Sequence, residues 1–320
     1  MNNKRFFNIC LVIPSILFFG LLSCSNKQSE QKITFGICTD VHKDIMHDAD
    51  ERLISFVNEM NQRQVDFTIQ LGDFCRPYEY NDTFMNIWNS FDGPKYSVLG
   101  NHDMDGGFSR DETLSYFDMP AKYYSFNIKG FHFIVLDGND KSETPQEGYA
   151  RYIGIEQENW LKNDLLSTDY SCIIFLHQSL EDEWGIENAA EIRSILENEN
   201  LKSGKDKVIA CFNGHSHMDT AININDIWYV EVNSMSYFWV GEKYMHNSYI
   251  DLLEESFPWL KYTCPYEEPL YAVVTIDSKG KISIEGKKTN WVGPSPAEIG
   301  YSYEKYMDRI KPEITNMLLK

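Results

Sequence analysis

The feature that most constrains this chain is a series of short apolar runs, each ending abruptly in a polar cluster. Five such runs are ITFGIC (33–38), DFTIQL (66–71), KYSVL (95–99), CIIFL (172–176) and KVIACF (207–212). Most are apolar throughout, as expected of strands that are covered on both faces. Residues 48–64, 156–166 and 189–197 instead repeat their apolar positions at helical spacing. Strands that alternate with helices predict an α/β fold.

Three hairpin patterns indicate that the sheets are not purely parallel. Strand-like runs flank the turn sequences Lys129-Gly130, Asn225-Asp226 and Ser278-Lys279-Gly280. Such turns reverse the chain between antiparallel neighbours. Mixed sheets with helices outside them therefore fit the pattern better than a simple doubly wound sheet.

A polar cluster follows each apolar run at its carboxyl end, which is the edge where open α/β sheets bind their ligands. The clusters are Thr39-Asp40-Val41-His42, Gly72-Asp73, Gly100-Asn101-His102-Asp103, His177 and Gly214-His215-Ser216-His217. Five of the chain's eight histidines lie in them, a concentration that random placement would not produce. We therefore expect a ring of polar groups at one sheet edge. Imidazole, carboxylate and amide groups without a thiolate suit divalent Mn, Fe, Zn or Ni.

The motifs D-x-H, G-D, G-N-H-D, H and G-H-x-H, in this order, resemble the calcineurin-like metallophosphoesterase superfamily. Each motif is weak alone, but five in order, each after a strand, form a specific signal. The resemblance implies a four-layer αββα sandwich with mixed sheets, which we place at residues 33–290. Residues 291–320 form an extension, with a helix expected from Tyr301 to Leu319 and a break or kink at Pro312.

The same resemblance implies a centre of two divalent metal ions. One ion would take Asp40, His42, Asp73 and His217, and the second would take Asp73, Asn101, His177 and His215. Asp73 would bridge the ions by offering one oxygen to each. A hydroxide held between the ions would attack phosphorus, since two-metal sites both activate water and clamp phosphate oxygens.

The G-N-H-D motif supplies two further expected roles. His102 would stand beside the phosphate and stabilise or protonate the leaving oxygen, and Asp103 would hydrogen-bond the other ring nitrogen of His102. Arg76 occupies the position where purple acid phosphatases need a metal-binding tyrosine, which disfavours that branch. Arg76 is either a donor to a phosphate oxygen or a structural arginine.

Aromatic residues crowd into residues 228–271. This segment is either a cap that stacks on the substrate or an appended packing layer. Tyr237, Phe238 and Trp239 are the expected substrate contacts, because they follow the G-H-x-H loop and its hairpin.

The N-terminus has the layout of an export signal. Lys4 and Arg5 precede an apolar stretch from Ile9 to Leu22, and the segment ends at Ser23-Cys24. The ending resembles a bacterial lipobox, so residues 1–23 are predicted as a signal peptide, Cys24 as the lipidated residue and residues 24–32 as a tether. An ordinary N-terminal membrane anchor is the alternative. The predicted location is the bacterial cell envelope, anchored to a membrane by lipid.

Charge limits the substrate. Removing residues 1–23, which contain two bases and no acid, takes the formal net charge from −19 to −21. Such a chain repels long nucleic acids, so a small phosphorylated molecule is expected. The predicted reaction is hydrolysis of a small phosphodiester or diphosphate compound. A phosphomonoesterase on the same site, or a non-catalytic ligand-binding lipoprotein, are the alternatives.

Overall fold

The computed structural model describes residues 1–2 and 32–320, whose strands form two six-stranded sheets and one two-stranded ribbon. Cys24, and the predicted signal peptide and tether apart from their outermost residues, lie outside this described part. The ribbon pairs β10 (Tyr237–Trp239) with β11 (Thr263–Pro265).

The first sheet is built around β1, which pairs in parallel with β2 and antiparallel with β12. Its order is β14 (Met317–Leu319), β13 (Ile282–Glu285), β12 (Ala272–Asp277), β1 (Lys32–Cys38), β2 (Phe67–Gln70) and β3 (Lys95–Ser97). Because β1, β2 and β3 run in parallel, their carboxyl ends reach one edge together.

The second sheet has four parallel inner strands and an antiparallel strand on each side. Its order is β4 (Tyr124–Ile128), β5 (Phe131–Val135), β6 (Ser171–Phe175), β7 (Val208–Asn213), β9 (Ile227–Glu231) and β8 (Thr220–Ile224). Both sheets are mixed, as the hairpin patterns predicted.

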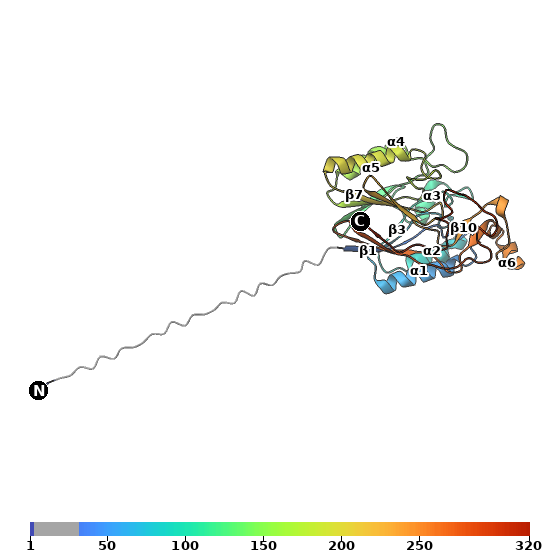
Figure 1. Cartoon of the computed structure of the whole chain (residues 1–320), viewed down its shortest axis with the longest axis horizontal. Helices are drawn as coiled ribbons and strands as arrows, with labels where there is room; N and C mark the ends of the chain where they lie inside the picture. The colour runs from blue at the N-terminus through green and yellow to red at the C-terminus, as the bar shows by residue number, and fades with distance from the viewer. Residues whose placement is uncertain (3–31) are drawn as a thin grey trace. The chain divides into compact units, whose positions relative to one another are not determined.

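Helices cover the outer face of each sheet and complete four layers (Figure 1). Helices α1 and α2 pack against the first sheet, and α4 and α5 pack against the second. The helices are α1 (Ala49–Arg63), α2 (Asp82–Asn89), α3 (Arg110–Tyr116), α4 (Ile155–Leu166), α5 (Ala189–Ser203) and α6 (Asp251–Ser256). Short 3₁₀ turns lie at Glu79–Asn81, Glu242–Tyr244 and Leu260–Tyr262. The predicted αββα sandwich is confirmed.

An aromatic core fills the space between the two sheets. Phe35 at its centre is fully buried, with its ring stacked 4.8 Å from that of Phe67. The rings of Phe133, Phe175 and Phe212 on the opposite sheet meet Phe35 edge-on, with centroids 5.7–6.0 Å away. Edge-to-face contacts of this kind favour a single packing arrangement of the sheets.

The helix expected over residues 301–319 is not formed. Residues 304–309 make turns, and Met317–Leu319 is strand β14, which pairs antiparallel with β13. Pro312 removes a helical donor and restricts the residue before it to extended geometry. The strand then satisfies its backbone at the open edge of the first sheet. The C-terminal residues are therefore part of the sandwich.

The described part of the chain contains neither a disulfide nor a membrane-spanning helix. The cysteines of the described part, Cys38, Cys75, Cys172, Cys211 and Cys264, are all buried and free, so Cys75 and Cys264 form no disulfide. Within residues 1–2 and 32–320, no helix has the length and apolar character to cross a membrane.

Gly36 on β1 allows α1 to lie close to the first sheet. A Cβ placed at this glycine would overlap the thioether of Met60 and approach the ring of Phe56. We predict that Gly36→Ala lowers the free energy of unfolding by about 1–3 kcal/mol, because the core must shift to admit a methyl group. Urea unfolding measures this loss. In a Met60→Ala background the cost of Gly36→Ala should nearly vanish; an equal cost in both backgrounds would contradict the explanation.

Candidate metal centre

The polar clusters predicted from the sequence meet at one edge of the sandwich. Each follows the carboxyl end of a parallel strand: β1, β2, β3, β6 and β7. Within the clusters, two groups can each surround an ion with ligand atoms no more than 4.8 Å apart. They are Asp40, His42 and His217, and Asp73, His177 and His215.

Two imidazoles are oriented by backbone carbonyls. Nδ1 of His177 donates to the carbonyl of Leu71 at 2.8 Å, and Nδ1 of His217 donates to that of Tyr237 at the same distance. A carbonyl only accepts, so Nδ1 carries a proton in both rings and Nε2 is the nitrogen that faces the ligand groups.

The carboxylates of Asp40 and Asp73 each have one oxygen that accepts hydrogen bonds from the protein. Asp40 Oδ2 accepts from the Thr39 hydroxyl at 2.6 Å and from the His215 amide at 3.0 Å. Asp73 Oδ1 accepts from the His102 amide at 2.8 Å. Asp73 Oδ2 lies 3.2 Å from His177 Nε2 and 3.8 Å from His42 Nε2. Asp73 Oδ2 is therefore the oxygen that faces both groups, and it would be available to metal ions held there.

Asn101 tests whether the site suits a metal. Its side chain is buried, yet neither its oxygen nor its nitrogen has a hydrogen-bond partner among the described residues. Buried amides are normally paired, so an orphan beside two ligand groups needs an explanation. Coordination of a metal ion by the amide oxygen would explain the missing partner. The imidazole, carboxylate and amide groups together suit a divalent metal.

Backbone strain is concentrated at the same residues. Asp40, His42, Asp73, His215 and His217 all have positive φ, between 50° and 76°. Side chains other than glycine rarely adopt this conformation, which costs about 1–3 kcal/mol per residue. Strain at five proposed ligands marks the strand ends as the functional part of the fold.

Two glycines of the motifs permit close approach of the loops. A Cβ on Gly100 would overlap the backbone nitrogen and carboxylate of Asp73, and one on Gly214 would overlap Thr39 and the carboxylate of Asp40. Glycine is therefore required there by contact with the two acidic ligands.

Burial and mutual charge set the protonation of the site. Burial lowers the pKa of both His42 and His215 to about 3, so these rings are neutral. Burial acts against the charged form of His177 too, but Asp73 and Asp40 raise its pKa to about 9. A metal binding at His177 must therefore displace a proton.

Comparison with known protein families agrees with a metal-binding phosphoesterase site. The family model described as calcineurin-like phosphoesterase matches residues 33–219, more than half of the chain. The chain belongs to this family. Its two buried His/Asp groups are intact, so it is a metal-dependent phosphoesterase by family and by site.

Solved structures of the same fold have low sequence identity to this phosphoesterase. A dimetal phosphatase from Danio rerio is 15% identical, with 82% of this chain and 99% of that chain covered and a TM-score of 0.59. GAP50, the anchor in the inner membrane complex of Plasmodium, is 16% identical, with 82% and 89% covered and a TM-score of 0.54. No curated protein matches the chain by sequence.

The phosphoesterase orients His102 through a residue that the sequence did not reveal. Nδ1 of His102 lies 2.8 Å from Asp105 Oδ2, not beside Asp103. Asp103 instead accepts from the backbone amides of Asp73, Phe74 and Gly100 at 2.7–3.1 Å. The predicted partnership of Asp103 with His102 is therefore wrong, because Asp103 is occupied in joining two loops. The backbone amide of Asp105 donates to the carbonyl of His102 at 3.1 Å, and this turn brings the two side chains together.

Asp105 also gathers groups from distant segments. It accepts from the Tyr149 hydroxyl at 3.0 and 3.1 Å, and from Arg76 at 3.2 Å. The Tyr149 ring lies against that of His102, with centroids 4.5 Å apart. Tyr149 belongs to the long loop between β5 and α4, and nothing in its local sequence marked it.

A cavity of about 460 Å³ opens beside the ligand groups. Its lining comprises His42, Ile45, Asp73, Arg76, His102, Asp105, Tyr149, His215, His217, Tyr237, Trp239 and Trp259. Tyr237 is buried with its ring stacked on His42, whereas Trp239 and Trp259 are exposed at the rim. Phe238 does not line the cavity. Side chains alternate along β10, so Phe238 packs on the other side against Tyr301.

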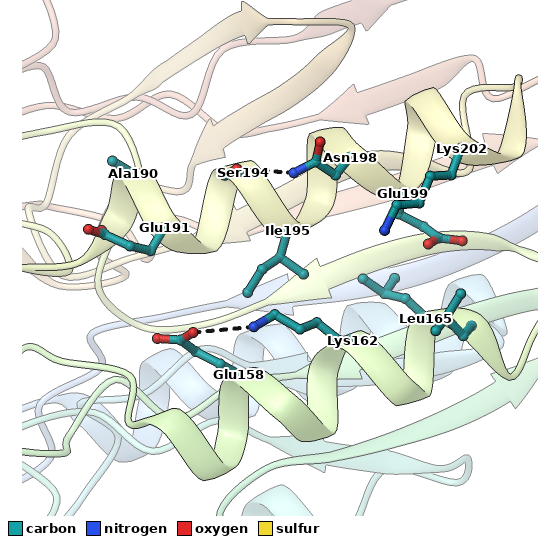
Figure 2. Close-up of a pocket in the computed structure, with 11 residues that line it drawn as sticks. Glu158, Lys162, Leu165, Ala190, Glu191, Ser194, Ile195, Asn198, Glu199 and Lys202 are labelled. Atoms are coloured by element: carbon teal, nitrogen blue, oxygen red, sulfur yellow. Dashed lines mark hydrogen bonds and ion pairs between the residues drawn. The ribbon is translucent and has the colours of Figure 1, made fainter.

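A second cavity, of about 530 Å³, lies between α4 and α5 (Figure 2). Its walls pair opposite charges, as in the ion pair of Glu158 with Lys162 at 3.6 Å. None of the proposed metal ligands or aromatic contacts lines it, so it is separate from the metal centre.

We predict that Asp105→Asn reduces kcat by about 10- to 100-fold, the usual loss when the partner that orients a catalytic or ligating histidine is removed. Thermal stability should change less than in Asp103→Asn, because the Asp105 side chain is 23% exposed whereas Asp103 is fully buried. Asp103→Asn is the contrasting variant: it replaces a buried acceptor of three amides and should lower the melting temperature instead. Steady-state kinetics and thermal melting of both variants give the comparison. Equal kinetic losses without a stability difference would contradict these roles.

Proposed function

We propose that this phosphoesterase hydrolyses a small phosphodiester or diphosphate compound, with the phosphate at the two His/Asp groups and the leaving group in the aromatic part of the cavity. The observation that carries the proposal is the shape and lining of the 460 Å³ cavity. Polar ligands form one side of it, and Trp239 and Trp259 extend it well beyond the space that one phosphate occupies.

Asp40, His42 and His217 would hold one metal ion, Asn101, His177 and His215 would hold a second, and Asp73 would contribute to both. Bound ions would supply a water of lowered pKa and neutralise phosphate charge. His102 stands at the cavity wall with its Nδ1 held by Asp105, so its Nε2 is available to donate a proton to the leaving oxygen. Arg76 lines the same wall and can donate to a non-reacting phosphate oxygen.

Charge favours a diester over a monoester. Arg76 is the one lysine or arginine that lines the cavity as described, and its contact with Asp105 already offsets its charge. A diester carries one negative charge at neutral pH, whereas a monoester carries close to two. The diester therefore needs less compensation from the protein.

We also propose that the mature enzyme is exported and held at the bacterial cell envelope by lipid on Cys24. The support is the basic start, the short apolar stretch and the cysteine that follows Ser23. Labelling cells with a fatty-acid analogue tests it. The wild-type chain should be labelled and Cys24→Ala should not; label on both would contradict lipidation at this residue.

Hydrolysis of bis-p-nitrophenyl phosphate and p-nitrophenyl phosphate, measured side by side with added Mn²⁺, tests the substrate class. We expect the diester to be preferred in kcat/KM. Trp239→Ala should raise KM for the diester by about 2- to 13-fold, equivalent to one aromatic contact of about 0.5–1.5 kcal/mol, and should affect the monoester less.

A preference for the monoester would replace the proposal with a phosphomonoesterase. If neither ester is cleaved with Mn²⁺, Fe²⁺, Zn²⁺ or Ni²⁺ and the chain also binds no metal, the catalytic proposal fails and a ligand-binding lipoprotein is supported.

A further inference from the structure

Three acidic residues form a separate cluster near the metal centre, with one of them buried and two half-buried. Glu181 and Asp182 lie in the loop that follows β6, and Glu231 is the last residue of β9. One carboxylate oxygen from each lies within 4.8 Å of the others. None of the three belongs to the two His/Asp groups.

The cluster lacks the donors that buried carboxylates require. Glu231 is 1% exposed, and neither of its oxygens has a hydrogen-bond partner in the described part of the chain. Both oxygens of Glu181 are also shielded from solvent and without a partner there. Acids on a surface are satisfied by water, but carboxylate oxygens that are shielded from solvent and lack a close donor are strongly unfavourable.

A neighbouring amide oxygen has the same deficit. Asn213 pairs with Glu231 in the register of β7 with β9, so the two side chains project from the same face of the sheet. Asn213 is 1% exposed, and its Oδ1 is also without a partner among the described residues. Asn213 Oδ1 therefore adds one more oxygen that could coordinate a cation bound by the three acids.

The protein compensates the cluster in part, since Ser216 and Ser179 act on the pKa of Glu231 and Glu181 in the direction that favours the charged forms. The Ser216 hydroxyl donates to Asp182 Oδ2 at 3.1 Å. The charge of Arg309 acts on Glu181 and Glu231, but its guanidinium lies over the Tyr306 ring, 4.8 Å from the centroid. Burial, followed by the charge of Asp182, raises the pKa of Glu181 to about 7.

We propose that Glu181, Asp182 and Glu231 bind a calcium ion, a third cation site distinct from the two His/Asp groups. Ca²⁺ takes oxygen ligands alone and accepts irregular arrangements of carboxylates and amide oxygens, which suits a cluster without histidine or cysteine. Mg²⁺ gives up its waters reluctantly and is disfavoured where the ligands are buried.

The ion would stabilise the loop that carries two metal ligands. Ser216 lies between His215 and His217 and is hydrogen-bonded to Asp182. Calcium at the cluster would tie the loop after β6 to β9 and, through Ser216, hold the G-H-S-H loop. Its effect on the metal centre is one of positioning.

Calcium titration of the full purified chain, dialysed into calcium-free buffer with its resident metals, tests the proposal by calorimetry. We expect one saturable Ca²⁺ per chain and a rise in melting temperature with calcium. Glu231→Gln should abolish both effects. Asp73→Asn, which damages the His/Asp groups, and Glu183→Gln, which removes an exposed acid of the same loop, should retain both.

The variants separate the alternatives. Glu231→Gln relieves an unpaired buried charge and should fold without calcium; if it does not, Glu181→Gln takes its place. Absence of saturable calcium binding in the wild-type chain overturns the proposal. So does binding that is lost in Asp73→Asn and kept in Glu231→Gln, because the calcium would then occupy the His/Asp groups.

Discussion

Replacing Asp73 by asparagine is expected to lower kcat/KM by about four orders of magnitude or more, a loss of about 5.5 kcal/mol in transition-state stabilisation. Asp73 Oδ2 lies 3.2 Å from His177 Nε2 in one ligand group and 3.8 Å from His42 Nε2 in the other. Asparagine removes the negative charge between the two groups, so both metal affinities should fall together.

Metal content and kinetics measured on the same sample check this result. Wild-type protein dialysed with Mn²⁺ should retain about two ions per chain, and Asp73→Asn should retain fewer than one. Asp92→Asn makes the same chemical change at an exposed position and should behave like the wild type. Full activity of Asp73→Asn with two bound ions would rule out its central place in the site.

The second large effect is on stability. Phe35→Ala is expected to reduce the free energy of unfolding by about 3–5 kcal/mol, the usual cost of removing a buried phenyl ring. Phe35 is fully buried and contacts aromatic rings on both sheets, so little can collapse into the space it leaves. For a chain of this size the melting temperature should fall by about 10 °C.

Thermal melting of Phe35→Ala beside Ile54→Ala gives the matched comparison. Ile54 is a large apolar residue on α1 but is 42% exposed, so its truncation should cost much less. Equal losses for the two variants would mean that the inter-sheet aromatic core is not the main source of cohesion. The two His/Asp groups should keep their arrangement in both variants, because neither residue belongs to them.

The sequence determined the α/β class and the metal-binding groups for a common reason. Strands covered on both faces must be apolar throughout, so ITFGIC or CIIFL can be recognised without any knowledge of their partners. Parallel strands place their carboxyl ends at one edge, so the polar residues that follow them are brought together by topology. That is why Asp40, Asp73 and His177 could be assigned to one site.

The tertiary structure alone decided contacts between segments that have no local pattern in common. Asp105, rather than Asp103, orients His102 because the loop geometry turns Asp103 toward three backbone amides. Tyr149 reaches the cavity from a loop that carries no motif.

The C-terminus is a second case in which a tertiary contact, and not the local sequence pattern, decided the structure. The apolar spacing of residues 301–319 fits a helix, yet Met317–Leu319 forms β14 at an open sheet edge. Local spacing reports which residues are apolar. It does not report which backbone groups elsewhere in the molecule lack a hydrogen-bond partner. The unpaired backbone groups of β13 at the sheet edge determined that Met317–Leu319 forms a strand.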